Sequence, residues 1–145
     1  MTEFRIEVDI PAHPDRVWAV LCDVESWPDW TTTVTRIQRL NASPLAVGSR
    51  FRIYQPKLLP AIWQITEFDE SARTITWVTR SPGIQVTASH VVVPSRDSNG
   101  ATATLSLNFS GFLGPLVARL TSKLNHRYLA IEVAGLKQRS TRTAL

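Results

Sequence analysis

Hydrophobic residues occupy every second position from Phe4 to Ile10, with charged residues at the positions between them. This period of two predicts a strand with one buried face and one face in water. Pro11 ends the pattern. Pro14 followed by Asp15 predicts the start of a helix, because proline and an acidic side chain are both favoured in a first helical turn.

Apolar residues then recur with helical spacing. Val17, Leu21 and Val24 fall on one stripe of a helix. The segment Trp27–Trp30 follows, and it is long enough for only one further helical turn. Two short helices are therefore expected after the first strand.

Strand patterns fill the chain from residue 31 to residue 110. Each run is bounded by proline, glycine, asparagine, aspartate or serine, the residues that favour turns. The predicted strands are Thr33–Leu40, Gly48–Gln55, Ile62–Phe68, Arg73–Arg80, Ile84–Val93 and Ala101–Ser110. Six strands at this spacing predict a strongly curved antiparallel sheet.

One long helix is predicted near the end of the chain, from Pro115 to about Gln138. The apolar face expected to pack on the sheet consists of Leu116, Val117, Leu120, Leu124, Tyr128, Ile131 and Ala134. A second apolar patch, made of Leu129, Val133 and Leu136, lies on another side, so the last turns are expected to be covered all round. The polar tail after Arg139 is expected to fray.

The predicted order is strand, two short helices, six strands and one long helix. It indicates a single α+β domain over residues 1–145, in which a seven-stranded antiparallel sheet curves around the C-terminal helix as in the helix-grip fold. Seven curved strands enclose more volume than one helix fills. We therefore expect an internal cavity beside the N-terminal half of that helix.

Composition narrows the class of protein. The chain has 145 residues and one cysteine, Cys22, so it can form no disulfide within itself. No apolar run approaches the roughly 20 residues that span a bilayer, and the acidic residues Glu3 and Glu7 do not fit a secretory signal. A cytoplasmic protein without an integral membrane segment is expected, as a monomer or a homodimer.

The net charge of +4 is unevenly distributed. Acidic residues concentrate in the first 30 positions and basic residues after position 115. The bases are not interleaved with aromatic residues as single-strand nucleic-acid binding would require, so no nucleic-acid partner is expected. Arg119, Lys123 and Arg127 recur at every fourth position, along one flank of the predicted helix.

Several short segments, in this order, resemble the SRPBCC superfamily, also called START-like or the polyketide cyclase/dehydrase and lipid transport family. They are Pro14–Trp18, Trp27–Trp30, Val47–Phe51, Ile65–Asp69, Ser89–Val91 and Phe109–Pro115. The resemblance covers essentially the whole chain and implies a hydrophobic pocket between the sheet and the C-terminal helix. Members use that pocket for lipid carriage, hormone binding, polyketide cyclisation or co-chaperone work, so the fold leaves the function open.

Aromatic and aliphatic residues on the inward faces are the candidate walls of this pocket. The predicted ligand-binding residues are Trp30, Phe51, Ile53, Gln55, Trp63, Trp77, His90, Phe109, Leu120, Leu124 and Tyr128. For any single tryptophan, plain core packing is the competing interpretation. Gln55 and Tyr128 could each supply one oriented polar contact, or simply end a strand and edge a helix.

His90 is the candidate for chemistry, because it shares a strand face with Val86, Ala88 and Val92. A histidine at an apolar wall can donate, accept or move a proton near neutral pH. It could equally be a core histidine satisfied by its neighbours. The histidines and the single cysteine have no metal-ligand spacing, and no phosphate-binding or dinucleotide glycine motif is present, so neither metal nor cofactor is expected.

Three functions remain open. The first is binding of an apolar or aromatic small molecule, lipid or polyketide-like, as a carrier. The second is a polyketide cyclase or dehydratase in which His90 transfers a proton, which calls for a second titratable group beside it. The third is an interaction module that uses the basic flank of Arg119, Lys123 and Arg127 on an acidic partner or membrane surface.

Overall fold

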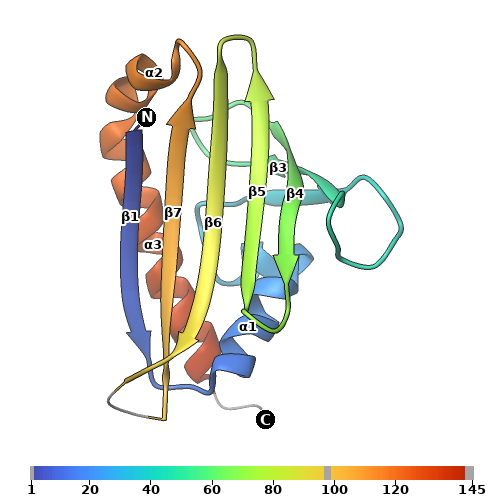
Figure 1. The fold of residues 1–145 in the computed structure, drawn as a ribbon, viewed down its shortest axis with the longest axis vertical. Helices are drawn as coiled ribbons and strands as arrows, with labels where there is room; N and C mark the ends of the chain where they lie inside the picture. The colour runs from blue at the N-terminus through green and yellow to red at the C-terminus, as the bar shows by residue number, and fades with distance from the viewer. Residues whose placement is uncertain (1, 97–98, 143–145) are drawn as a thin grey trace.

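The computed structural model describes residues 2–96 and 99–142, and in these residues seven strands form one antiparallel sheet (Figure 1). The strand order across the sheet is β1-β7-β6-β5-β4-β3-β2. The strands are β1 (Thr2–Ile10), β2 (Arg36–Arg39), β3 (Arg50–Tyr54), β4 (Ala61–Asp69), β5 (Thr74–Ser81), β6 (Ile84–Pro94) and β7 (Ala101–Ser110). The predicted curved antiparallel sheet with a C-terminal helix is confirmed.

Two short helical segments connect β1 to β2. They are α1 (Pro14–Cys22) and the 3-10 helix η1 (Val24–Asp29). His13 caps α1, since its Nδ1 accepts a hydrogen bond of 3.1 Å from the backbone N–H of Asp15. The Asp15 carboxylate forms an ion pair of 2.7 Å with Arg73, which ties α1 to the start of β5.

The C-terminal helix is interrupted, which differs from the prediction of one helix from Pro115. The structure has α2 (Gly114–Leu120) followed by α3 (Ser122–Thr141). At the junction, Thr121 has φ −104° and ψ 10°, and its hydroxyl donates a hydrogen bond of 2.7 Å to the Val117 carbonyl. Such a bond from a threonine side chain to the preceding turn bends helices. Among the described residues the helix continues through Thr141, beyond the predicted fraying at Arg139, and residues 143–145 lie outside the described part.

The buried face of α3 also differs from the predicted one. Its buried apolar residues are Leu129, Val133 and Leu136, the patch expected on another side of the helix. Leu116 and Leu120, predicted to face the sheet, are 54% and 76% exposed.

The second strand is shorter than the predicted Thr33–Leu40. Thr31 and Thr33 are buried, and their hydroxyls form a hydrogen bond of 2.9 Å with each other. This bonding holds residues 31–33 in an irregular connection, so pairing with β3 begins only at Arg36.

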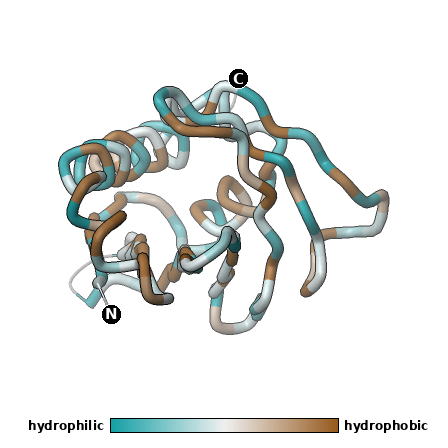
Figure 2. Tube along the Cα trace, turned by 90° about the horizontal axis from the view of Figure 1, so that it is seen from above, coloured by the Kyte–Doolittle hydropathy of each residue, from teal (hydrophilic) through white to brown (hydrophobic). Residues whose placement is uncertain are grey.

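Two apolar clusters fill the interior. The first joins β1, β7 and β6 to α1 and α3, and includes Leu105, Phe109 and Leu129. The second joins β3, β4 and β5 to η1, and includes Phe51 and Trp77. Hydrophobic and hydrophilic residues are mixed along the whole trace (Figure 2), and no helix in the described residues is long and apolar enough to cross a membrane.

Candidate ligand-binding cavity

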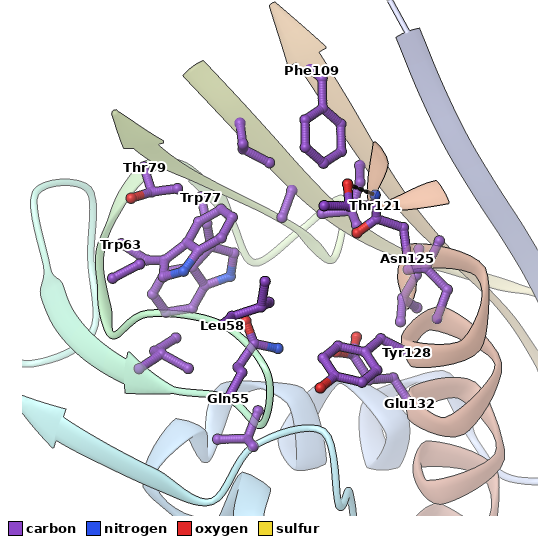
Figure 3. Close-up of a pocket in the computed structure, with 18 of the residues that line it drawn as sticks. Gln55, Leu58, Trp63, Trp77, Thr79, Phe109, Thr121, Asn125, Tyr128 and Glu132 are labelled. Atoms are coloured by element: carbon purple, nitrogen blue, oxygen red, sulfur yellow. Dashed lines mark hydrogen bonds between the residues drawn. The ribbon is translucent and has the colours of Figure 1, made fainter. Parts of the chain in front are cut away.

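A cavity of about 520 Å³ separates part of the sheet from α3 (Figure 3). The backbone of α3 packs on β1 and β7, at one edge of the sheet (Figure 1), and in the described residues it does not come close to β3, β4 or β5. Side chains bridge the gap instead. The Tyr128 hydroxyl donates to the Pro56 carbonyl, and the Thr33 hydroxyl donates to the Glu132 carboxyl.

The sheet side of the cavity is largely apolar and aromatic. Strand register places Trp77, Ala88 and Leu107 side by side on β5, β6 and β7, and all three line the cavity. Trp27, from η1, contacts Trp77 edge to face, with ring centroids 5.7 Å apart. Figure 3 shows Trp63 and Trp77 on one side of the cavity, with Tyr128 and Glu132 of α3 on the other.

The structure brings most of the predicted binding residues together. Those that line the cavity are Ile53, Gln55, Trp63, Trp77, His90, Phe109 and Tyr128. All except Tyr128 lie on strands of the sheet or, for Gln55, directly after one.

Four predicted residues are not among those that line it. Phe51 is fully buried and packs against Trp77, with ring centroids 5.5 Å apart, so it lies within the core cluster behind the wall. Trp30 packs beside Trp27 at the end of η1. Leu120 points into solvent and Leu124 is half-buried elsewhere.

His90 lies on the inward face of β6 and is buried. Burial lowers its pKa to about 4, because the charged imidazolium would lose its hydration. Its ring lies beside the Trp27 indole, with centroids 5.6 Å apart, and its Nδ1 has no hydrogen-bond partner among the residues that the structure describes. The imidazole is therefore neutral at physiological pH.

Sequence inspection missed Glu132, the carboxyl group that lines this cavity. Burial raises its pKa to about 7, and the hydrogen bond of 3.0 Å from the Thr33 hydroxyl works in the opposite direction. The sequence does contain a signal for Glu132. A spacing of three and four residues puts Asn125, Tyr128 and Glu132 on one helix face, and Tyr128 is itself a predicted binding residue.

The described residues offer no constellation for a metal, since no three histidine, cysteine, aspartate or glutamate side chains come together there. Cys22 is half-buried, and burial raises the pKa of its thiol to about 12. A thiol with so high a pKa is a poor nucleophile and a poor ligand at neutral pH.

Several solved structures have a fold similar to that of this chain over nearly its whole length. A protein from Thermobifida fusca solved by NMR is 25% identical, with 97% of this chain and 93% of that one covered and a TM-score of 0.79. Truncated norcoclaurine synthase from Thalictrum flavum is 13% identical, with 99% and 95% covered and a TM-score of 0.76. BexL, the di-domain ARO/CYC of the BE-7585A biosynthetic pathway, is 17% identical, with 96% and 46% covered and a TM-score of 0.72. The last two likenesses show the fold alone.

Sequence relatives and a family model complete the comparison. The uncharacterized protein Rv2574 of Mycobacterium tuberculosis is 33% identical over 46 residues, a stretch that covers 32% of this chain and only 28% of the relative. The family model described as polyketide cyclase / dehydrase and lipid transport matches residues 1–141. The chain therefore belongs to the polyketide cyclase/dehydrase and lipid transport family.

Proposed function

We propose that the protein binds and carries an apolar or aromatic small molecule, lipid or polyketide-like, in the cavity between the sheet and α3. The observation that supports this function is the cavity of about 520 Å³ with the indoles of Trp27, Trp63 and Trp77 in its walls. A protein interior is normally packed with few voids larger than a water molecule. A space of this size with aromatic walls is the usual form of a small-molecule site.

Burial of ligand surface would drive binding. Removal of apolar surface from water contributes about 25 cal/mol per Å², before the costs of association. The indole and phenyl rings favour a planar ligand, because aromatic pairs gain about 0.5–1.5 kcal/mol beyond the area they bury.

A cyclase or dehydratase acting on a polyketide-like substrate is the second candidate. Its support is that His90 and Glu132, two titratable groups, line the same cavity, in a fold shared with the ARO/CYC protein BexL. However, an imidazole with a pKa of about 4 is a weak general base at neutral pH. A carrier therefore ranks first.

A fluorescence titration with 1-N-phenylnaphthylamine, a neutral aromatic probe, tests the proposal. We expect the wild type to bind the probe saturably. We expect Ala88→Trp to weaken binding about tenfold or more, which is about 1.4 kcal/mol. Ala88 lines the cavity, and an indole at this position would fill it. Thr87→Trp is the matched control, since the neighbouring side chain points to the opposite face of β6.

Either of two results would contradict the proposal. One is a wild-type protein that does not bind the probe. The other is a folded Ala88→Trp variant that binds it as well as the wild type and the Thr87→Trp control do.

A further inference from the structure

Apart from Leu129, the residues of α3 and its N-cap that line the cavity are polar. Four residues spaced by four, three and four positions line it: Thr121, Asn125, Tyr128 and Glu132. Figure 3 shows them together on the helix side, opposite Trp63 and Trp77. A cavity that took only hydrocarbon would gain nothing from such a face, because each polar group in contact with an apolar ligand loses hydration without compensation.

Most hydrogen-bond donors on this face are already engaged by the protein. The Thr121 hydroxyl donates to Val117, and the Tyr128 hydroxyl donates to Pro56. The Asn125 amide donates one N–H to Thr121 over 2.9 Å. A hydroxyl has one proton to donate and two lone pairs, so these groups present mainly acceptor atoms to the cavity.

Glu132 adds two further acceptor oxygens. Its Oε1 accepts one hydrogen bond, from Thr33, which is buried and held by Thr31. A carboxylate has about four acceptor positions, so a single protein donor leaves most of them unused. In the described residues, no ion pair to Glu132 is formed.

The other titratable groups that line the cavity do not compensate this carboxyl. His90 on β6 is neutral, because burial lowers its pKa to about 4. Burial also raises the pKa of Tyr128 on α3, so that its hydroxyl is neutral. Lys57, in the loop after β3, is exposed. A half-buried carboxyl without a counter-charge is costly to the protein, and it becomes favourable when a ligand supplies the positive charge.

We propose that the ligand carries a protonated amine on an apolar or aromatic body, and that Glu132 pairs with the amine while the tryptophan wall takes the body. This inference rests on the proposed function of the cavity. An ammonium group has three donors and no acceptor, which matches a face of acceptors.

Two probes of nearly the same shape test the inference: 2-(2-naphthyl)ethylamine, a cation, and 2-(2-naphthyl)ethanol, its neutral counterpart. Binding is measured at pH 8 by competition with 1-N-phenylnaphthylamine. We expect the wild type to bind the amine about tenfold more tightly than the alcohol, the ratio for a hydrogen bond to a charged group. Glu132→Gln is expected to reduce this preference to about one, because the amide keeps the shape and loses the charge.

Glu67→Gln is the matched control. Glu67 also accepts a threonine hydroxyl at 3.0 Å, from Thr76, but it is exposed and does not line the cavity. This variant should keep the tenfold preference for the amine.

The pH dependence of amine binding distinguishes an ionised Glu132, which accepts hydrogen bonds from the ligand, from a protonated Glu132, which donates one. An alkylamine resembles lysine, with a pKa of about 10.4, so it stays charged while Glu132 ionises. Amine affinity in the wild type should therefore rise from pH 6 to pH 8, and in Glu132→Gln it should not.

Three results would overturn the inference. Equal binding of amine and alcohol by the wild type would remove the role of Glu132 and leave the cavity's proposed function intact. Amine affinity that falls toward pH 8 would mean that the ionised Glu132 does not pair with the ammonium group. Failure of both probes and of 1-N-phenylnaphthylamine to bind would remove the proposed function itself.

Discussion

Glu132 and His90 line the same cavity, and loss of hydration moves their pKa values in opposite directions. It raises the pKa of the acid to about 7 and lowers that of the imidazole to about 4, since burial always disfavours the charged form. At physiological pH the cavity therefore contains a neutral histidine and a carboxyl near its midpoint of ionisation. The polar character of the site depends on Glu132 more than on the histidine.

Glu132 should make the stability of the protein depend on pH. An acid whose pKa rises on folding, here from 4.5 to about 7, binds more protons in the folded than in the unfolded state between these values. The free energy of unfolding therefore falls as the pH rises through this window. Relative to Glu132→Gln, we expect the wild type to lose about 1–3 kcal/mol between pH 5 and pH 8.

Urea unfolding of both proteins at several pH values measures this difference. His90 is present in both, so its own contribution cancels in the comparison. A difference between the two proteins that stays constant from pH 5 to pH 8 would show that the Glu132 carboxyl is hydrated in the folded state.

At the scale of elements, the strands could be predicted well from the sequence. The period of two and the turn residues located every strand, and they oriented Ile53, Trp63 and Trp77 toward the interior. Irregular pairing in β4 lies between Ile65 and Glu67, after Trp63, so it does not disturb this alternation.

The C-terminal helix could not be predicted as well, for two physical reasons. Thr121 bonds back to Val117 and interrupts the helix, an interaction that no periodicity reveals. Polar residues also occupy the face that looks into the cavity, so a search for an apolar stripe selected Leu120 and Leu124 and passed over Glu132.

Gly135 marks a close approach of α3 to the backbone of Trp30. It is buried, and a Cβ at this position would collide with the backbone carbonyl of Trp30. Helix propensity alone favours Gly135→Ala by about 1 kcal/mol. We expect the opposite: a loss of about 1–3 kcal/mol in the free energy of unfolding, the usual cost of overpacking.

Chemical denaturation of Gly135→Ala beside Ala134→Gly separates the two effects. Ala134 is exposed, so its change to glycine should cost only the propensity of about 1 kcal/mol. A stabilised Gly135→Ala protein would mean that Trp30, directly after η1, and α3 do not approach as closely as described.

At the scale of the whole molecule, the cavity follows from where α3 rests. The helix packs on β1 and β7, while the curved sheet continues through β5 and β4 beyond its reach. The sequence pattern was sufficient to expect an internal space, since the length of the sheet exceeded what one helix covers. The polarity of the cavity wall formed by α3 depends on which face of that helix points inward. This orientation could be seen only in the structure.

The most direct measurement of ligand binding uses the tryptophans as reporters. Trp27, Trp63 and Trp77 line the cavity, whereas Trp18 stacks on Phe68, with ring centroids 5.6 Å apart, and Trp30 lies outside the lining. A titration with 1-N-phenylnaphthylamine, followed by the indole N–H signals in a ¹H–¹⁵N NMR spectrum, examines all five at once. The signals are assigned by single Trp→Phe variants.

We expect saturable shifts in the signals of Trp27, Trp63 and Trp77, with those of Trp18 and Trp30 nearly unchanged. Rings that enter the cavity would lie beside the first three indoles and away from the other two. Shifts at Trp18 or Trp30 without shifts at Trp63 and Trp77, or no saturable shift at any indole, would contradict binding in this cavity.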